Sequence, residues 1–199
     1  MLSDPLKLSF LIGWAIYAFV IYEPSSHRFR RQKVAQEHSR PLDILHDMAT
    51  LVAWQVLPLV YVFTPWLDCA NYHLSWWAGW AGVAALACAI LVLHAAYRAL
   101  GANWSPKLDV REGQRLVTSG IYSLIRHPIY AGMWLWTVSQ PFVIQNWIAG
   151  WGMLVLFLPL YLIRVPREEA MLLQQFGEQY HDYMRGTGRV IPPILRQTP

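Results

Sequence analysis

Charged residues are scarce in this sequence of 199 residues. Only 14% are Asp, Glu, Lys or Arg, whereas 55% are hydrophobic and 11 are tryptophan. A soluble domain contains about 25% charged residues, so this composition indicates a membrane protein. The net charge of +4 is small, and the aromatic residues fall within apolar runs rather than among basic clusters. A surface that binds nucleic acid is therefore not indicated.

Several familiar sequence signatures are absent. The two cysteines, Cys69 and Cys88, are too few for a disulfide framework, and they show neither CxxC nor Cys/His ligand spacing. We expect both to pack as small apolar residues, and we predict no bound metal. The chain has no GxGxxG motif after a predicted strand and no GxxxxGK(S/T) motif, which excludes the dinucleotide-binding and P-loop signatures.

The apolar runs predict an all-α integral membrane protein with about five spans. A bilayer core of about 30 Å takes roughly 17 to 25 apolar residues per helix, and residues 6–22, 44–65 and 74–97 supply three such runs. Residues 131–163 are too long for one span. Their middle contains Gln140-Pro141 and Gln145-Asn146, which predict two helices joined by a tight turn.

Of the 16 Lys and Arg residues, all but Lys7 fall in three hydrophilic segments, and their placement predicts the orientation. These segments are the connector after the first span, the connector at residues 98–128 and the tail at residues 164–199, while the links at residues 67–73 and 145–146 hold no Lys or Arg. The positive-inside rule places the basic segments in the cytoplasm, with the N-terminus outside and the C-terminus inside. We expect the first span to be retained, because Asp4 precedes it and no small-x-small cleavage site follows.

His46, Asp47 and His94 lie inside or at the edges of the predicted spans, and they are candidate functional groups because polar residues within a membrane are often functional. His46 lies near the cytoplasmic end of its predicted helix, where snorkelling or a hydrogen bond between helices is the ordinary explanation. The role of His94 stays open.

Two polar segments bracket the predicted hairpin, "DVREGQRLVTSGIYSLIRHPIY" and "YLIRVPREEAMLLQQFGEQYHDY". Taken separately, the first is typical of an interfacial segment with a proline in the first turn of a helix, and the second of a tail helix that begins with carboxylates. Antiparallel helices, however, return to the same membrane face. His127 and Tyr130 should therefore lie close to Arg164 and Glu168 at the boundary between membrane and cytosol.

The stretch "GQRLVTSGIYSLIRHPIYAG", followed by "RVPREEAMLLQQFGEQYHDYMRGTGRVIPPI", resembles the isoprenylcysteine carboxyl methyltransferase family. That family belongs to a group of membrane methyltransferases that also includes phospholipid N-methyltransferases. The resemblance covers about residues 101–199. It implies a helical enzyme that uses S-adenosyl-L-methionine without a Rossmann domain. We expect one domain over residues 1–199, with three spans in 1–97 and the cofactor-binding and catalytic part in 98–199.

The resemblance also implies roles for individual residues. Glu168 matches an acidic residue that contacts the cofactor, and Arg164 matches an arginine that faces the substrate carboxylate, so both are predicted catalytic residues. A further cofactor contact falls near Lys107-Leu108, where the sequence departs from the eukaryotic pattern. The other predicted cofactor contacts are Gln114, Arg115, Leu116, Val117, Tyr122, His127, Pro128, Ile129 and Tyr130.

Three functions stay open at this point. The first is methyl esterification of an isoprenylcysteine-like lipid acid, in which a prenylated small molecule or protein C-terminus enters from the bilayer. The second is N-methylation of a phospholipid or another amine, which needs a base such as His127 or an acidic residue, and Glu169 has no other assigned role. The third is a helical transporter or scaffold subunit, which would bind no cofactor.

Overall fold

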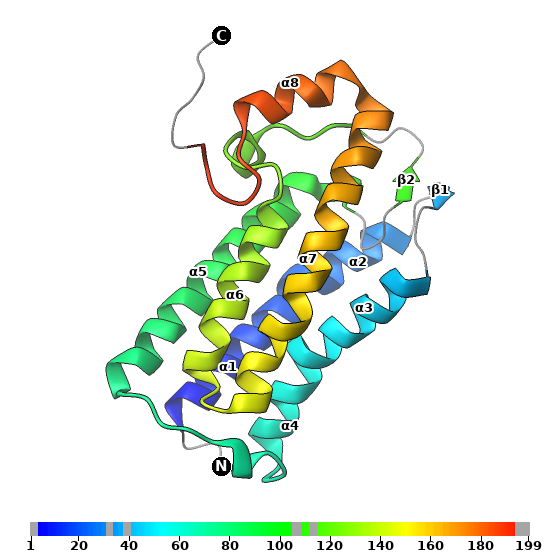
Figure 1. Ribbon diagram of the computed structural model, residues 1–199. Coiled ribbons are helices and arrows are strands. Elements are labelled where there is room, and N and C mark those ends of the chain that lie inside the picture. Colours follow the sequence, from blue (N-terminus) through cyan, green and yellow to red (C-terminus); the bar gives the residue numbers. More distant parts are fainter. Residues whose placement is uncertain (1–3, 31–33, 38–40, 105–108, 112–114, 194–199) are drawn as a thin grey trace.

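The structure is a computed structural model that describes residues 4–30, 34–37, 41–104, 109–111 and 115–193. Within these residues, five long helical segments lie alongside one another, and a short helix crosses one end of the bundle (Figure 1). Every apolar run predicted as a span forms helix, so the helical fold expected from the sequence is confirmed.

The first two segments each contain a π-helical stretch. Helix α1 (Pro5–Ala15), η1 (Ile16–Tyr22) and α2 (Glu23–Arg30) follow one another without a break. The second segment consists of α3 (Pro41–Leu51), η2 (Val52–Val56) and α4 (Leu57–Phe63). π-Helical turns are frequent at functional sites. Here they bring Tyr17 and Trp54 together, with ring centroids 4.8 Å apart.

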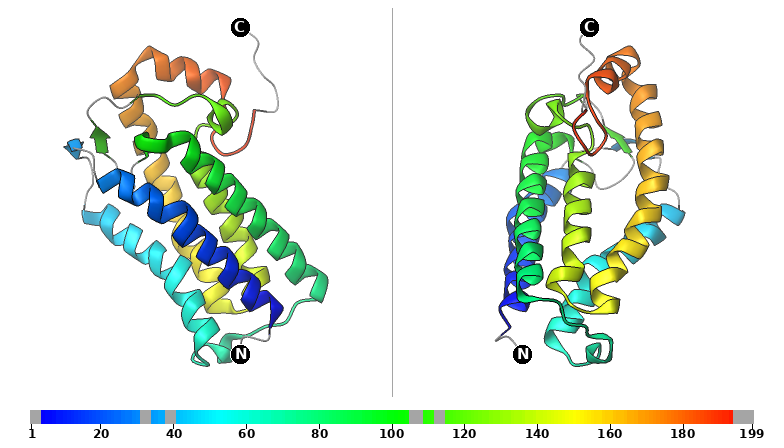
Figure 2. Two further views of the ribbon diagram at one scale, coloured as in Figure 1. Left: turned by 180° about the vertical axis from the view of Figure 1, so that it is seen from behind. Right: turned by 60° about the vertical axis from the view of Figure 1, so that its left-hand side comes forward.

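The remaining long segments are α5 (Trp76–Leu100), α6 (Pro128–Val143) and α7 (Trp147–Phe176). Helix α6 lies between α5 and α7 (Figure 2). Glycines let α6 approach α5 closely: a Cβ atom on Gly132 would lie 2.6 Å from Leu93 Cγ, and one on Gly82 would lie 2.5 Å from Phe142 Cβ. Small residues serve this purpose at helix interfaces in membranes.

The two ends of the bundle differ in character. At one end, α8 (Glu178–Gly186) crosses the bundle, and strand β1 (Val34–Glu37) pairs antiparallel with β2 (Asp109–Arg111) (Figure 1). The opposite end holds η3 (Asp68–Ala70) and the turn between α6 and α7. Large tryptophan side chains are exposed next to these turns: Trp66, Trp76, Trp77, Trp80 and Trp147. Exposed tryptophans of this kind are typical of a membrane–water interface.

Three helices of the described residues are long and apolar enough to cross a membrane: Pro5–His27, Trp76–Leu100 and Trp147–Phe176. The second segment contains a shorter apolar helix, Asp47–Phe63. The chain therefore has the features of an integral membrane protein. The prediction of five crossings and of their orientation stays a prediction.

Three details differ from the sequence-based expectations. The β1–β2 pair was not anticipated in an all-α fold, because four-residue and three-residue strands in hydrophilic connectors have no periodicity to reveal them. Pro141 does not end α6, since it lies in the last turn, where the single lost N–H donor costs little and the Tyr72 hydroxyl donates to its carbonyl. The tail helix is not separate, because α7 continues past Arg164 to Phe176.

A glycine ends α7 and redirects the chain into α8. Gly177 has φ 54°, a left-handed conformation that glycine adopts readily, and its N–H donates to the Leu173 carbonyl. The next helix, α8, ends at Gly186.

The turn between α6 and α7 is built around Asn146. Its side-chain oxygen accepts hydrogen bonds from the N–H groups of Ile148 and Ala149, each at 3.0 Å, which caps the first turn of α7. Its amide nitrogen donates to the Leu67 carbonyl at 2.6 Å and to Asn71 Oδ1 at 2.9 Å. One buried side chain thus joins the α4–α5 link to the hairpin turn.

We expect Asn146→Ala to lower the free energy of unfolding by about 2–3 kcal/mol, because a helix cap is lost and buried partners are left without hydrogen bonds. Circular dichroism during denaturation in detergent measures this change. The exposed Gln174 of the same helix provides the control, since Gln174→Ala should stay within about 0.5 kcal/mol of the parent chain. Equal effects of the two substitutions would contradict the role given to Asn146.

Candidate active site

A cavity of about 570 Å³ lies among the helices and is lined by residues from both halves of the chain. This volume is within the usual range of roughly 300–1,000 Å³ for small-molecule sites. Nine of the residues predicted from the sequence line it: Arg115, Leu116, Val117, Tyr122, His127, Ile129, Tyr130, Arg164 and Glu168.

The other predicted positions have different outcomes. Pro128 is buried at the first position of α6 and is not among the residues that line the cavity, because its ring occupies the helix start. Gln114 and the Lys107-Leu108 pair lie outside the described residues, as does the side chain of His46. His94 is exposed on α5, away from the cavity lining.

The two helices of the hairpin are joined across the cavity. The Tyr130 hydroxyl of α6 donates to Glu168 Oε2 of α7 at 3.0 Å. Tyr130 is buried, whereas Glu168 is half-buried and borders the cavity. The sequence-based prediction that Tyr130 and Glu168 lie close together is therefore confirmed, although their roles stay predictions.

Arg164 pairs with a carboxylate from the N-terminal half of the chain. Its Nη1 atom donates to Asp47 Oδ1, which joins α7 to α3. The side chain of Arg164 is 14% exposed and that of Asp47 is 35% exposed, and both border the cavity. Sequence reasoning did not single out Asp47 for this site, because no local spacing relates residues on α3 and α7.

The buried carboxylate of Glu169 has three hydrogen-bond partners. It accepts from Arg126 Nε at 2.7 Å and from Arg189 Nη2 at 2.6 Å, and its Oε1 lies 3.2 Å from His127 Nε2. The hydrogen bonds and charge of Glu169 also raise the pKa of Arg189. Glu169 is therefore not a spare group, as the sequence had suggested, but the centre of an ion cluster.

This Glu169 cluster attaches the C-terminal segment to the start of α6. The N–H of Arg126 donates to the Gly188 carbonyl and that of His127 to the Arg189 carbonyl, both at 2.9 Å. The Arg126 guanidinium also donates to the Thr187 carbonyl. The segment after α8 is thereby fixed beside the cavity, where it helps to cover His127, whose side chain is 2% exposed.

Tyrosine hydroxyls at this end remain protonated donors. Burial and the nearby Glu168 raise the pKa of Tyr122 well above its ordinary value. At neutral pH its hydroxyl is therefore neutral, and it can donate to a ligand but cannot act as a base. Tyr183 of α8 donates to the Tyr122 carbonyl at 2.6 Å and so holds this part of the connector.

Another part of the cavity lining is aromatic and comes from segments in which the sequence predicted no site residues. Tyr17 and Tyr97 share a hydrogen bond at 3.3 Å, and Trp54 packs beside Tyr17. No sequence signal separates these residues from lipid-facing aromatics, because every span contains both kinds.

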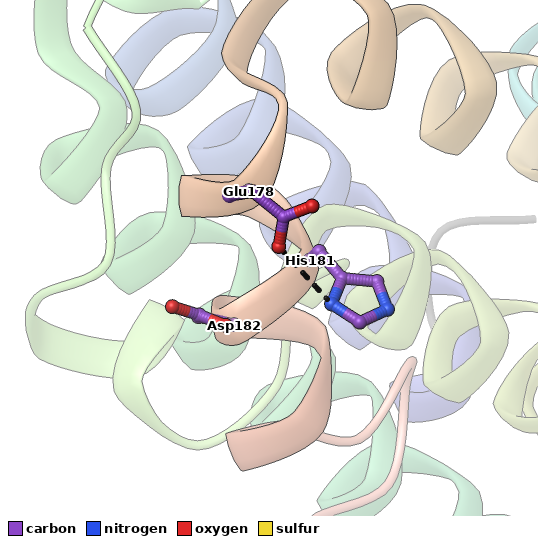
Figure 3. A group of neighbouring side chains, drawn as sticks. All are labelled: Glu178, His181 and Asp182. Carbon is purple, nitrogen blue, oxygen red and sulfur yellow. Dashed lines mark ion pairs between the residues drawn. The ribbon is translucent and has the colours of Figure 1, made fainter.

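An exposed group on α8 has spacing that a metal ion could use. The ligand atoms of Glu178, His181 and Asp182 lie within 4.8 Å of one another (Figure 3). His181 Nδ1 is 3.8 Å from Glu178 Oε2, and Asp182 pairs with Arg185. All three side chains are exposed, which is typical of a solvated helix face, so the group gives no reason to assign a metal.

Comparison with known proteins bears on the part of the chain that holds the hairpin. The family model described as isoprenylcysteine carboxyl methyltransferase matches residues 81–174. These residues belong to the isoprenylcysteine carboxyl methyltransferase family. They include His127, Tyr130, Arg164 and Glu168, the residues that first indicated the family.

Relatives of this methyltransferase family match over a longer stretch. A protein-S-isoprenylcysteine O-methyltransferase of Dictyostelium discoideum is 30% identical over 154 residues, which are 74% of this chain and 61% of the relative. Protein-S-isoprenylcysteine O-methyltransferase A of Arabidopsis thaliana is 29% identical over 119 residues, 59% of this chain and 60% of the relative. This chain therefore spans about 60% of the length of these relatives.

A solved structure confirms the fold. It is described as the eukaryotic intramembrane Ras methyltransferase of this family and has a TM-score of 0.62 and 22% sequence identity. The match covers 98% of this chain and 70% of the other. At this identity the likeness concerns the fold alone. It extends to the N-terminal helices, which the family model does not include.

We expect Glu169→Gln to lower the free energy of unfolding by about 3–5 kcal/mol, because Arg126 and Arg189 would keep their charges without the carboxylate that neutralises them. Chemical denaturation in detergent measures the loss. Glu178→Gln, on the exposed face of α8, is the matched control and should change stability by no more than about 0.5 kcal/mol. A similarly small change for Glu169→Gln would show that the ion cluster does not hold the fold.

Proposed function

We propose that this chain is an S-adenosylmethionine-dependent methyltransferase that esterifies the carboxylate of an isoprenylcysteine-like lipid acid. The single observation that carries the proposal is one cavity bordered by both Glu168 and Arg164, one helical turn apart on α7. The relatives named above as protein-S-isoprenylcysteine O-methyltransferases support the same reaction.

The residues present fit S-adenosylmethionine. The half-buried Glu168 offers a carboxylate for the ammonium group, and Leu116 and Val117 offer an apolar wall for the adenine. Tyr122 and Tyr130 are placed to contact the methionyl part. When bound, this cofactor supplies an activated methyl group, which the acceptor oxygen takes up as the bond to sulfur breaks.

The acceptor end of the cavity fits a carboxylate. Such a group has a pKa of about 3.5 at a peptide C-terminus and is ionised at neutral pH, so it needs no general base. The mostly buried guanidinium of Arg164 can orient it through charge-assisted hydrogen bonds. The residues around it keep water away from the nucleophile, and holding the two reactants in line accounts for much of the rate.

The distribution of exposed residues supports entry of a lipid from the bilayer and of the cofactor from the cytosol. We propose that the end with α8 and the β1–β2 pair faces the cytoplasm, because the basic connectors and the tail meet there. The exposed tryptophans at the opposite end would then lie at the outer interface. The N-terminus would be outside and the C-terminus inside, with five crossings.

N-methylation of a phospholipid or other amphipathic amine is the second candidate, because two carboxylates, Asp47 and Glu168, border the cavity and would suit a cation. An amine must lose a proton around methyl transfer. His127 and Glu169, which the sequence offered as a base and as an unassigned acidic residue, lie against each other in the ion cluster. A carboxylate acceptor therefore fits the site better.

We expect the purified protein to convert N-acetyl-farnesylcysteine and labelled S-adenosylmethionine into a methyl ester that releases its label in base. A base-stable methylamine from a phospholipid would favour the second candidate instead. No turnover with several prenyl acids would refute the substrate, and no binding of S-adenosylhomocysteine in calorimetry would revive a transporter or scaffold role.

We expect Glu168→Ala and Arg164→Ala to fail in different ways. Loss of the Glu168 carboxylate should weaken binding of S-adenosylhomocysteine at least tenfold, since a charge-assisted hydrogen bond is removed. Arg164→Ala should leave that affinity within about threefold and lower turnover at least a hundredfold, because the acceptor loses its orienting group. Calorimetry and steady-state kinetics separate the two effects. Unchanged cofactor affinity in Glu168→Ala would contradict its assignment.

A further inference from the structure

Arg164 already holds a carboxylate, and that carboxylate belongs to the protein. The Arg164 guanidinium donates to Asp47 Oδ1, so the group proposed to bind the acceptor is engaged by a side chain of α3. The family model matches residues 81–174 and leaves Asp47 outside. Neither the resemblance nor the comparisons assign it a role.

We propose that Asp47 competes with the carboxylate of the acceptor for Arg164. In the absence of the acceptor Asp47 pairs with Arg164, and the acceptor displaces it on binding. This inference rests on the proposed function, since it takes Arg164 as the residue that orients the acceptor. It goes beyond that function by naming a residue that sets the affinity for acids and their discrimination from neutral or cationic lipids.

The exposure of the two partners favours displacement of Asp47 rather than of Arg164. The Arg164 side chain is 14% exposed and stands on the long helix α7, one turn before Glu168, which accepts a hydrogen bond from Tyr130. Asp47 is 35% exposed and lies in the second half of α3. When it leaves the guanidinium, its charge can turn toward water or headgroups, which costs far less than leaving a buried charge unpaired.

Charge balance in the cavity also favours displacement. Among the described residues that line the cavity, the carboxylates are Asp47 and Glu168, and both influence the guanidinium of Arg164 electrostatically. The other two arginines of the lining are Arg115 and Arg126, and Arg126 already pairs with Glu169. A third carboxylate close to the same guanidinium would be repelled by the first two. The cofactor ammonium would neutralise Glu168, so the remaining conflict is with Asp47. An acid can bind well only as Asp47 moves away.

Asp47 should also affect the affinities of acidic, neutral and cationic ligands differently. A neutral lipid brings no anion to replace Asp47, and an amine is attracted by Asp47 rather than repelled. The presence of Asp47 therefore weakens binding of acids and strengthens binding of cations. Removing its charge should move the two affinities in opposite directions, which a residue with a purely structural role would not do.

The experiment compares Asp47→Asn, which removes the charge at nearly constant shape, with Asp47→Glu, which keeps it. For the asparagine variant we expect the Kd and KM of N-acetyl-farnesylcysteine to fall about tenfold, as for removal of one like-charge contact, with kcat within about threefold. Affinity for S-adenosylhomocysteine should stay at the parent value, and Asp47→Glu should resemble the parent chain. Calorimetry gives both dissociation constants without turnover.

The matched control is Asp182→Asn, which removes an exposed carboxylate that also pairs with an arginine, on α8. It should alter none of these constants. Farnesylamine serves as the cationic probe, and its affinity should fall in Asp47→Asn. If Asp47→Asn does not fold, Asp47→Ser removes the same charge. Faster hydrogen exchange of α3 amides in the parent chain on binding the acid gives an independent reading of the displacement.

Opposite results would overturn the inference. A raised KM or weaker acid binding in Asp47→Asn would mean that Asp47 holds Arg164 in its working position, and no change would mean that the pair does not take part. These outcomes differ from failure of the proposed function. In that case the parent chain would form no ester, while the binding constants for the acid would still report whether Asp47 competes.

Discussion

The buried carboxylate of Glu169 is the interaction on which the arrangement of this site depends. It binds the side chains of Arg126, His127 and Arg189, which come from the connector before α6 and from the segment after α8. Two pieces of chain that are about sixty residues apart are thereby held against one helix. A buried charge requires such partners, since its desolvation is otherwise unfavourable. The connector before α6 and the segment after α8 supply these partners, and both lie at the end of the bundle beside the cavity.

Glu168 and Glu169 are adjacent in the sequence but have different roles: Glu169 stabilises the fold, whereas Glu168 is proposed to bind the ligand. Adjacent residues of a helix point in directions about 100° apart, so one side chain faces the closing segments while the other borders the cavity. Glu169 is buried, whereas Glu168 is half-buried and bound to Tyr130. The chemistry proposed for Glu168 therefore relies on a neighbour that never contacts the ligand.

Much of the fold could be predicted from the sequence, because the apolar runs have the length that a bilayer demands. The hairpin was predicted from its length and from Gln145-Asn146, and the return of α7 to the level of Tyr130 followed from antiparallel geometry. The β1–β2 pair could not be predicted, since it depends on pairing between distant segments. The continuous α7 and the π-helical stretches were not predicted either, because no local pattern in the sequence marks them.

In the candidate site, too, some residues could be predicted from the sequence and others could not. Residues in the two motifs, such as His127 and Arg164, could be identified because the resemblance covers them. Asp47 and Tyr17 could not, since they approach the site only through packing of the N-terminal helices, and no motif spacing spans α3 and α7. The role of Glu169 stayed open for a related reason: its three partners lie in segments whose relative position is set only by the folded chain.

A structure with S-adenosylhomocysteine and a farnesylated acid bound would test the central claim most directly. We expect the cofactor ammonium to contact Glu168 and the acid to pair with Arg164, with the sulfur facing the acid so that a methyl group would lie about 3–3.5 Å from its oxygen. A cofactor bound outside this cavity, or with its sulfur turned away from Arg164, would contradict the proposed function.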